Sequence, residues 1–157
     1  MGEPRISAAK KEDIEQAADL ILRMKRLNNE FDPLFTVVED VLDRAKSYLT
    51  HSLGSKNTVV LVATSGKKVV AILRAEIRDR LFYKPSRDGH ITDFYILPEY
   101  RRRALGNRML ERAAATLRRM GAEMVTAEVP AQNEIAVRFY SKRGFRALNN
   151  IFASRVD

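Results

Sequence analysis

Residues 92–110 decide the fold, and they read Thr92-Asp93-Phe94-Tyr95-Ile96-Leu97-Pro98-Glu99-Tyr100-Arg101-Arg102-Arg103-Ala104-Leu105-Gly106-Asn107-Arg108-Met109-Leu110. The aromatic and apolar run 94–97 predicts a buried strand, and Pro98 ends it because proline cannot donate a hydrogen bond to a strand ladder. After a basic loop, apolar residues recur at helical spacing from Leu105 to Met120, and Gly121 is a natural helix end. The stretch therefore predicts a strand, a basic loop and a helix in direct succession.

The loop and the helix start together predict a phosphate site. Residues 101–103 are all arginines, and Ala104 and Gly106 are small. The first backbone N–H groups of a helix have no partner within it and lie at the positive end of its dipole. Small residues at this point let an anion approach closely. We therefore predict a cradle for a phosphate or pyrophosphate group.

A second motif lies downstream and reads Asn133-Glu134-Ile135-Ala136-Val137-Arg138-Phe139-Tyr140-Ser141-Lys142-Arg143-Gly144-Phe145. It resembles the N-x-x-A-x-x-x-Y-x-x-x-G-F stretch of the GCN5-related N-acetyltransferase (GNAT) superfamily. Arg101-x-x-Ala104-x-Gly106 looks like the acyl-CoA signature of the same superfamily, Q/R-x-x-G-x-G/A. The two motifs, in this order and each next to its expected strand and helix, make a specific resemblance. It covers roughly the C-terminal half closely, whereas the N-terminal half matches in general layout.

One residue departs from the family pattern, because Ala104 stands where the family has its first glycine. A left-handed backbone at this position would cost alanine about 1 kcal/mol. Inside the first helical turn, by contrast, alanine is neutral or favourable. We expect the second arrangement.

The order of predicted elements indicates a mixed α/β or α+β sandwich. Strands are predicted at 5–10, 58–63, 69–77, 89–97 and 123–129, with a final strand pair at 145–153 around Asn149-Asn150, and helices at 11–27, 39–53, 105–120 and 133–143. This order agrees with the GNAT fold, a mixed and mostly antiparallel central sheet flanked by helices. The resemblance implies that strands 89–97 and 123–129 splay apart to admit the pantetheine arm of CoA. We expect one such domain over residues 1–157.

Composition excludes several classes of site. The chain has no cysteine, which excludes disulfides, thiolate metal sites and a cysteine nucleophile, and fits a cytoplasmic protein. Its two histidines, His51 and His90, have no carboxylates at ligand spacing, so we expect no metal site. No apolar run approaches membrane-spanning length, and we expect no membrane partner.

The net charge of +8 raises the question of nucleic acid. Lysines and arginines are scattered along the chain, and no nucleic-acid-binding motif is recognisable. A well-solvated surface of mixed charge, or a field that steers an anionic ligand such as CoA, explains the excess better. Nucleic acid is therefore not an expected partner.

Two loops are candidates for the acceptor site. The loop 28–35 is aromatic and acidic in a basic chain, so Glu30, Phe31 and Asp32 could line the site, with a carboxylate attracting a cationic amine. The alternative is a turn in which at least one of Phe31 and Phe35 packs onto the core. The charged loop 78–89 is either a second wall or an ordinary hairpin connection. The resemblance favours a role in substrate choice for the first loop.

Acyl transfer to an amine needs a group that takes up the amine proton. A lysine-like amine has a pKa of about 10.4 and an α-amine about 8, so a nearby carboxylate is required. Glu128 is the first candidate, because the run 127–133 is similar to the E-V-R-x-x-N run of ribosomal-protein N-terminal acetyltransferases, in which the glutamate is the base. Asp93 and Glu76 are further candidates, since strand alternation would direct one of them to the cleft. The alternatives are an exposed strand carboxylate for Glu128 and an edge residue paired with an arginine for Asp93.

The remaining roles follow from the resemblance. Tyr140 matches the family tyrosine and is the expected general acid, since its hydroxyl stays protonated at neutral pH; the alternative is a core tyrosine. Asn133 is expected to contact the CoA arm, to cap its helix, or both. Backbone N–H groups near 94–96 are expected to stabilise the oxyanion. The full set of residues expected to bind the cofactor is Phe94, Tyr95, Ile96, Arg101, Arg102, Arg103, Ala104, Leu105, Gly106, Asn107, Asn133 and Tyr140.

The sequence therefore predicts an N-acetyltransferase that uses acetyl-CoA, transfers the acetyl group directly to a primary amine and needs no metal. The run 128–133 favours a protein or peptide N-terminal amine, whereas the acidic loop 28–32 favours a small amine. The alternative is a catalytically silent acyl-CoA-binding sensor or a nucleic-acid-associated regulator. We count a homodimer among the possible assemblies.

Overall fold

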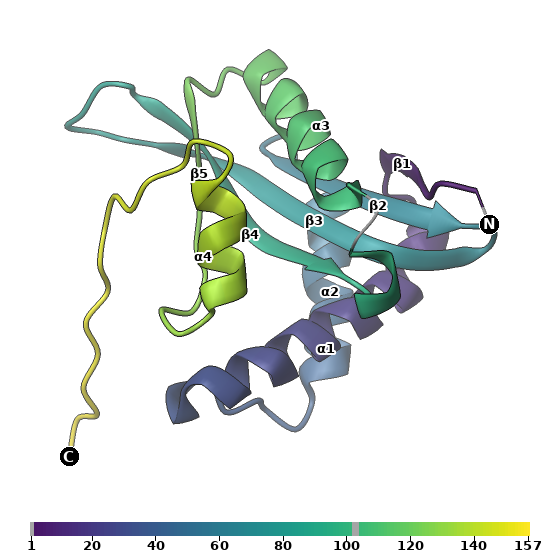
Figure 1. Cartoon of the computed structure of the whole chain (residues 1–157), viewed down its shortest axis with the longest axis horizontal. Coiled ribbons are helices and arrows are strands. Elements are labelled where there is room, and N and C mark those ends of the chain that lie inside the picture. The colour runs from purple at the N-terminus through teal and green to yellow at the C-terminus, as the bar shows by residue number, and fades with distance from the viewer. Residues whose placement is uncertain (1, 102–103) are drawn as a thin grey trace.

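The computed structural model describes residues 2–101 and 104–157 and is built around one five-stranded sheet of order β1-β2-β3-β4-β5 (Figure 1). In chain order the elements are β1 (Arg5–Ala8), η1 (Lys11–Asp13), α1 (Ile14–Phe31), η2 (Pro33–Phe35), α2 (Val41–Leu53), β2 (Thr58–Ser65), β3 (Lys68–Asp79), β4 (Arg87–Ile96), η3 (Pro98–Tyr100), α3 (Leu105–Arg119), β5 (Met124–Ala127) and α4 (Glu134–Ser141), where η marks a short 3-10 helix. Strands β1 to β4 are antiparallel neighbours, and β5 joins β4 in parallel. The predicted mixed, mostly antiparallel sheet is confirmed.

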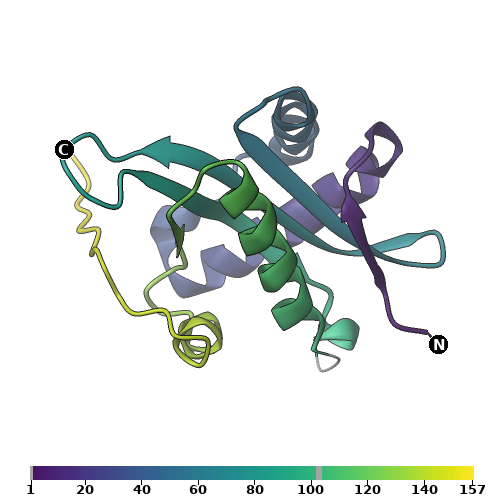
Figure 2. The same cartoon turned by 90° about the horizontal axis from the view of Figure 1, so that it is seen from above.

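Helices cover both faces of the sheet. Figure 1 shows α3 in front of the strands with α1 and α2 behind, and Figure 2 shows α2 and α3 on opposite sides. The core on both faces is made by β2, β3 and β4 with these helices; its largest fully buried side chains include Ile72, Leu73, Ile91, Leu105, Met109 and Leu117. Gly89 lets β4 approach α3, because a Cβ there would lie 2.8 Å from the Leu117 side chain. The core therefore fixes α3, and with it the predicted phosphate loop, against β4.

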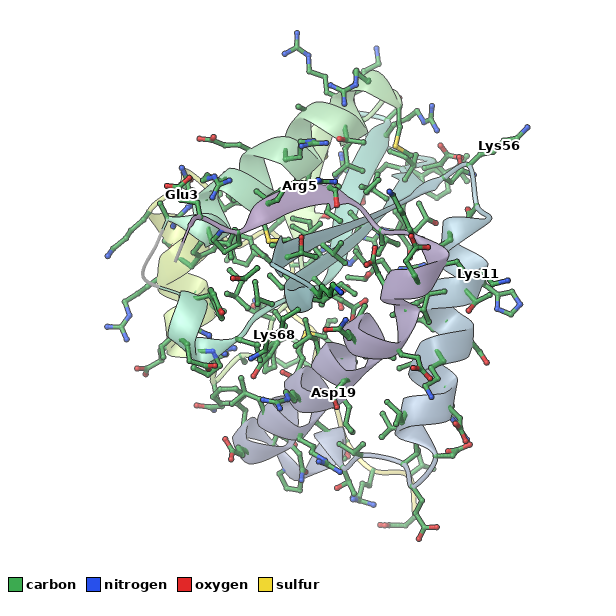
Figure 3. All side chains as sticks on the ribbon, turned by 90° about the vertical axis from the view of Figure 1, so that its right-hand side faces the viewer. Glu3, Arg5, Lys11, Asp19, Lys56 and Lys68 are labelled. Carbon is green, nitrogen blue, oxygen red and sulfur yellow. The ribbon has the colours of Figure 1, made fainter. Side chains whose placement is uncertain are left out.

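Charged side chains lie on the outside of this core. Figure 3 labels Arg5, Lys11, Lys56 and Lys68, which are exposed and come from different parts of the structure. The labelled cations therefore do not gather in one patch. None of the helices in residues 2–101 and 104–157 is long and apolar enough to cross a bilayer.

Several element boundaries differ from the sequence prediction, most clearly at the end of α1 and between β3 and β4. Helix α1 continues to Phe31, beyond the predicted end near Leu27, and stops at Asp32, which is extended with φ −159°. Asp32 precedes Pro33, and a residue before proline is disfavoured in a helix, so the break falls here. Likewise, β3 and β4 extend into the predicted loop 78–89, where the oppositely charged pair Arg78 and Asp88 face each other across the strands.

The predicted C-terminal strand pair is absent, and this prediction was wrong. Residues 145–157 form neither strand nor helix, and in Figure 1 they run away from α4 as a single extended segment. A strand needs a neighbour as well as a favourable composition, and no strand in the described chain pairs with this segment.

Candidate active site

The site is built where β4 and β5 separate. Their parallel pairing runs only from Asp88 opposite Met124 to Ile91 opposite Ala127. Beyond that point β4 continues to Ile96, paired with β3 alone. The predicted splay is therefore present, and it leaves the β5-facing backbone edge of β4 available to a ligand.

The start of α3 stands beside this opening. Ala104 precedes the helix with φ 55°, in the left-handed region, so the expectation that it would lie inside the first turn was wrong. The reason is tertiary: Leu105, the next residue, is fully buried, so its packing in the core takes precedence over the helix preference of Ala104. Among the residues that the structure describes, no side chain caps the helix, and its first bond runs from the Arg108 N–H to the Ala104 carbonyl. The preceding N–H groups, of residues 105–107, thus lack helical partners.

Arg101 is fastened to the end of β4. Its Nε donates to the carbonyl oxygen of Ile96 at 2.8 Å, and its guanidinium lies 5.2 Å from the centre of the Tyr95 ring. These contacts hold a positive charge near the uncapped helix start. Arg102 and Arg103, which the sequence also assigns to the phosphate loop, lie outside the described residues.

Helix α4 packs directly on the start of α3. A Cβ on Gly106 would lie 2.9 Å from Cε1 of Phe139, so glycine permits this close approach. The guanidinium of Arg143 lies 3.7 Å from the centre of the Phe139 ring, and its Nε donates to Oδ1 of Asn107 at 3.0 Å. Asn107, which the sequence assigns to the cofactor loop, has its side chain engaged in joining α3 to the turn that follows α4.

Asn133 and Tyr140 take up the two ends of α4. Oδ1 of Asn133 accepts from the Ala136 N–H at 3.1 Å, which is the expected helix cap. Tyr140 packs edge-on against Phe139 and Phe145, with 5.2 Å between ring centres in each case. Burial raises the pKa of Tyr140 above its ordinary value, so the phenol stays protonated. Its side chain therefore keeps a proton that it can donate.

Glu128 lies immediately after β5 and is held from β4. Its Oε1 lies 3.2 Å from Nε2 of His90, while its side chain remains 60% exposed. Nδ1 of His90 lies 2.8 Å from Oγ1 of Thr126, and Thr126 donates to Oδ2 of Asp88 at 2.6 Å. Arg78 completes the chain by donating to the same Asp88 oxygen at 3.2 Å. The candidate base thus ends a connected row of polar groups across β3, β4 and β5.

This row decides where the hydrogen of the imidazole sits. A hydroxyl has one hydrogen, and that of Thr126 points to Asp88, so Thr126 accepts from His90 and Nδ1 carries the ring hydrogen. Burial, followed by the charge of Arg78, lowers the pKa of His90, although Glu128 and Asp88 oppose the shift. His90 is therefore neutral near pH 7, and the lone pair of Nε2 faces the Glu128 carboxylate. A proton that arrives between these two atoms can form a hydrogen bond that joins them.

Asp93 is the centre of a second polar group on the same sheet face. Its side chain is 2% exposed and takes hydrogen bonds from Lys25 Nζ at 3.2 Å, the Tyr48 hydroxyl at 2.5 Å and the Thr92 hydroxyl at 2.8 Å. Burial and the neighbouring Asp93 raise the pKa of Tyr48, which keeps it a donor. The arginine partner considered for Asp93 was wrong, because its cation is Lys25, which reaches across from α1.

Glu76 is joined to the second polar group through Arg74. Arg74 Nη1 donates to Glu76 Oε1 at 2.7 Å and to Thr92 Oγ1 at 3.0 Å. Glu76 lies opposite His90 in the β3–β4 register. Since side chains of directly opposed residues share a face, the three candidate bases Glu76, Asp93 and Glu128 all lie on the α1 and α2 face. We call the side chains of both polar groups, together with Glu76 and Arg74, the polar strip.

The loop candidates do not join the polar strip. Asp32 Oδ1 accepts from the Leu34 N–H at 2.8 Å and so stabilises its own turn, while Glu30 is exposed at the end of α1. Phe35 is 43% exposed, and Phe31 is half-buried outside the main core, so the expected packing of one of them into the core was wrong. Within the described chain, no hydrogen bond or ion pair connects these residues to Glu128 or Asp93.

Several site residues escaped the sequence analysis, notably His90, Thr126, Tyr48 and Lys25. The available signal was the alternation of polar residues in the strands, at positions 88 and 90 and at positions 126 and 128. Within the described residues, His, Asp and Glu side chains form no group of three able to hold a metal ion.

Comparison with known proteins places the chain among acetyltransferases. The model of the acetyltransferase (GNAT) family matches residues 24–145. A tetramutant of a Bacillus halodurans protein has 18% identity and a TM-score of 0.83, covering 97% of this chain and 99% of its own. An aminoglycoside 6'-N-acetyltransferase from Acinetobacter haemolyticus has 17% identity and a TM-score of 0.75, covering 98% of this chain and 99% of its own. A predicted acetyltransferase from Clostridium acetobutylicum, solved with acetyl-CoA, has 16% identity and a TM-score of 0.77, covering 97% of this chain and 96% of its own. No curated protein matches the sequence.

Proposed function

Because the chain belongs to the GNAT acetyltransferase family, we propose that it transfers the acetyl group of acetyl-CoA directly to a primary amine. The observation that carries the proposal is the position of Glu128. This carboxylate is exposed at the point where β4 and β5 separate, and it rests against a neutral imidazole that can share an incoming proton.

The residues around the splay fit the CoA part of the substrate. The uncapped N–H groups at the start of α3 and the charge of Arg101 suit a diphosphate, which is anionic and accepts several hydrogen bonds. The free edge of β4 offers backbone donors and acceptors to the amide groups of a pantetheine arm. Asn133 is expected to add a contact at the start of α4. Acetyl-CoA supplies the activated acetyl thioester.

Proton movement follows from the protonation states in the site. Glu128 accepts the proton that the amine loses as its nitrogen bonds to the acetyl carbon, and His90 Nε2 shares that proton. Backbone N–H groups of β4 near residues 94–96 stabilise the negative oxygen that forms. As the bond between carbon and sulfur breaks, Tyr140 donates its hydroxyl proton to the leaving sulfur. Tyr140 then recovers a proton from solvent.

Charge in the polar strip bears on the acceptor. Four carboxylates, Glu76, Asp88, Asp93 and Glu128, stand against three permanent cations, Lys25, Arg74 and Arg78. The excess is a single negative charge when His90 is neutral, which suits one ammonium group. We therefore place a peptide N-terminal amine or a small monoamine ahead of polyamines and aminoglycosides.

A thiol-release assay tests the proposal. The protein is mixed with acetyl-CoA and, in separate reactions, with N-terminal peptides, monoamines, amino acids, polyamines and aminoglycosides, and free CoA is measured with time. Release that depends on one acceptor class supports the proposal and identifies that class. Calorimetric binding of CoA without release for any acceptor would contradict it and favour the silent acyl-CoA-binding sensor.

A further inference from the structure

A cavity of about 390 Å³ opens on the α2 face of the sheet, where α2 ends and β2 begins. Its lining comes from these two elements, the turn between them and β3, and consists of Tyr48, His51, Ser52, Ser55, Thr58 and Arg74. Of these six side chains, that of Arg74 carries the one permanent charge, and none is a carboxylate. Tyr48 and Arg74 also belong to the polar strip. The cavity is therefore a positively charged extension of that strip.

Arg74 is largely buried but has hydrogen-bond donors to spare. Its side chain is 10% exposed, and its guanidinium lies 4.2 Å from the centre of the Tyr48 ring. Nε donates to Oγ of Ser52 at 2.7 Å, and the two hydrogens of Nη1 go to Glu76 and Thr92. Within the described residues Nη2 donates to no acceptor, so two of the five N–H groups of the guanidinium are unused. Because Arg74 lines the cavity, these two N–H groups are what it offers to a molecule bound there.

A carboxylate is the ligand that suits this lining. Its oxygens accept strong hydrogen bonds from a guanidinium. Ser55 adds a donor: its Oγ accepts from the Asn57 N–H at 3.2 Å, which leaves its own hydrogen for a ligand. Glu76 already offsets part of the Arg74 charge from a distance of 2.7 Å, so a singly charged carboxylate fits the charge balance better than a doubly charged phosphate. The cavity is therefore best matched to one carboxylate group.

The cavity lies level with Glu128 but two strands away from it. Arg74 in β3 is paired with Asp93 of β4. Glu128 comes directly after Ala127 of β5, which is paired with Ile91 of β4. Arg74 and Glu128 therefore stand near the same point along β4, on the α1 and α2 face of the sheet. Since neighbouring strands are about 4.8 Å apart, two spacings separate them by roughly 10 Å.

We propose that the acceptor is a short peptide whose C-terminal carboxylate binds in this cavity while its N-terminal amine lies at Glu128. The orientation of the peptide rests on the proposed function, which places the amine at Glu128. An extended chain advances about 3.3 Å per residue, so a tripeptide spans the roughly 10 Å between the two ends. Glu76 lies on the way, with its side chain 34% exposed. Within the described residues its Oε2 has no hydrogen bond, so this oxygen can accept from a peptide N–H.

Acetyl transfer to trialanine and to trialanine amide tests the need for the carboxylate. The two peptides differ in the charge at the C-terminus, and the free acid should have a kcat/KM about tenfold higher or more. The same comparison for dialanine and pentaalanine should give a smaller preference, because neither length matches a distance of roughly 10 Å. Equal kcat/KM for trialanine and its amide would overturn the proposal. An equal preference at all three lengths would overturn it too, since it would report attraction to the basic surface as a whole.

A charge placed in the cavity locates the binding. Arg74 is unsuitable for replacement, because its hydrogen bonds also join β3 to α2 and β4. Ser55 is exposed, and an aspartate in its place can still accept from the Asn57 N–H, so Ser55→Asp adds a repelling carboxylate while the turn keeps its hydrogen bond. Lys56→Ala is the matched control, since it changes the net charge by the same single unit at the next residue, whose side chain points outward in Figure 3.

These two variants should differ in their preference for the free acid. Ser55→Asp should abolish the preference for trialanine over its amide, because two carboxylates would then meet in the cavity. Lys56→Ala should keep the preference. A preference that survives Ser55→Asp, or one that both variants lose equally, would place the carboxylate elsewhere and overturn the proposal. Melting temperatures close to wild type establish that both variants are folded.

Calorimetry separates the peptide site from the proposed function, because binding needs no catalysis. Trialanine is titrated in the presence of CoA into the wild type and into Ser55→Asp, which should bind it about tenfold more weakly. This result without any release of CoA from acetyl-CoA would support the cavity as the carboxylate site and refute acetyl transfer. Acetyl transfer to other amines, with neither binding of trialanine nor transfer to it, would refute the peptide acceptor and leave acetyl transfer standing.

Discussion

Nε2 of His90 lies 3.2 Å from Oε1 of Glu128, while the ring hydrogen, on Nδ1, is donated to Thr126. The two facing atoms are both acceptors until a proton reaches them. This geometry supports the proposed role of Glu128 in proton uptake, and it distinguishes Glu128 from Asp93, whose carboxylate is buried among donors from Lys25 and Tyr48.

Replacing Glu128 with glutamine should lower turnover by about 100-fold or more, the usual effect of a lost general base. The loss should be greatest at low pH, where a larger share of the acceptor amine is protonated and needs a base. The pH profile of kcat/KM measures this. Glu134→Gln, an exposed change in the first turn of α4, serves as the control. A loss of equal size at every pH would assign Glu128 to positioning.

Replacing His90 with glutamine should flatten the pH dependence of stability. Because the pKa of His90 is lowered in the folded state, the unfolded chain binds a proton at pH values at which folded His90 remains unprotonated. The contribution of His90 to the free energy of unfolding is therefore complete above the unfolded pKa of about 6.5. It declines as the pH falls below that value, by at most ~1.4 kcal/mol per pH unit. Unfolding by denaturant at pH 7, 6 and 5 measures the slope. An unchanged slope in His90→Gln would refute the account.

Replacing Tyr140 with phenylalanine should lower kcat by about 100-fold while CoA affinity and melting temperature stay close to wild type. The aromatic contacts with Phe139 and Phe145 survive the change, and only the hydroxyl is lost. Stopped assays and calorimetry separate these quantities. Tyr83→Phe, at the exposed β3–β4 tip, is the control. Loss of CoA affinity together with turnover would make Tyr140 a structural residue.

Replacing Arg101 with alanine should weaken CoA binding about tenfold, as expected for one charge-assisted contact. The effect should shrink at high salt, because the residue is exposed and its charge is screened. Calorimetry at two ionic strengths measures the dissociation constant of CoA. Lys56→Ala, which removes an exposed cation from another part of the surface, is the control. An affinity that does not change at either salt concentration removes Arg101 from the phosphate loop.

Replacing Gly106 with alanine should destabilise the fold by about 1–3 kcal/mol, because the new Cβ would lie 2.9 Å from Phe139. Adding Phe139→Leu should recover part of the loss by removing the ring. Thermal unfolding measures both variants. Gly54→Ala is the control, since a Cβ there meets only an ordinary contact at 3.7 Å. Equal stability of Gly106→Ala and wild type would show that α4 can shift freely on α3.

Local sequence patterns predicted most of the scaffold. The strand β4, the loop and α3 follow from an apolar run, a proline and helical periodicity, all readable within residues 92–121. Ala104 was misjudged because its left-handed backbone is imposed by the burial of Leu105, which helix propensity does not register. Similarly, residues 145–153 have the composition of strands, but composition does not supply a neighbour.

The polar strip could be predicted only in part. Glu128, Asp93 and Glu76 were found as candidates because each is a carboxylate in a predicted strand. Their partners depend on register: His90 meets Glu128 and Thr126 only because β5 pairs with β4 in parallel, at positions far apart in the sequence. A one-residue slip would turn these side chains to the other face, so no single segment reveals the contact.

The parallel junction between β4 and β5 also implies an order of assembly. Strands β2, β3 and β4 are sequence neighbours and pair as an antiparallel meander, which requires only short chain closures. β5 can dock only after α3 has crossed the sheet, a longer closure that takes place later. As the chain emerges from synthesis, strands β2, β3 and β4 can thus pair before Glu128 meets His90, so the candidate active site is completed last.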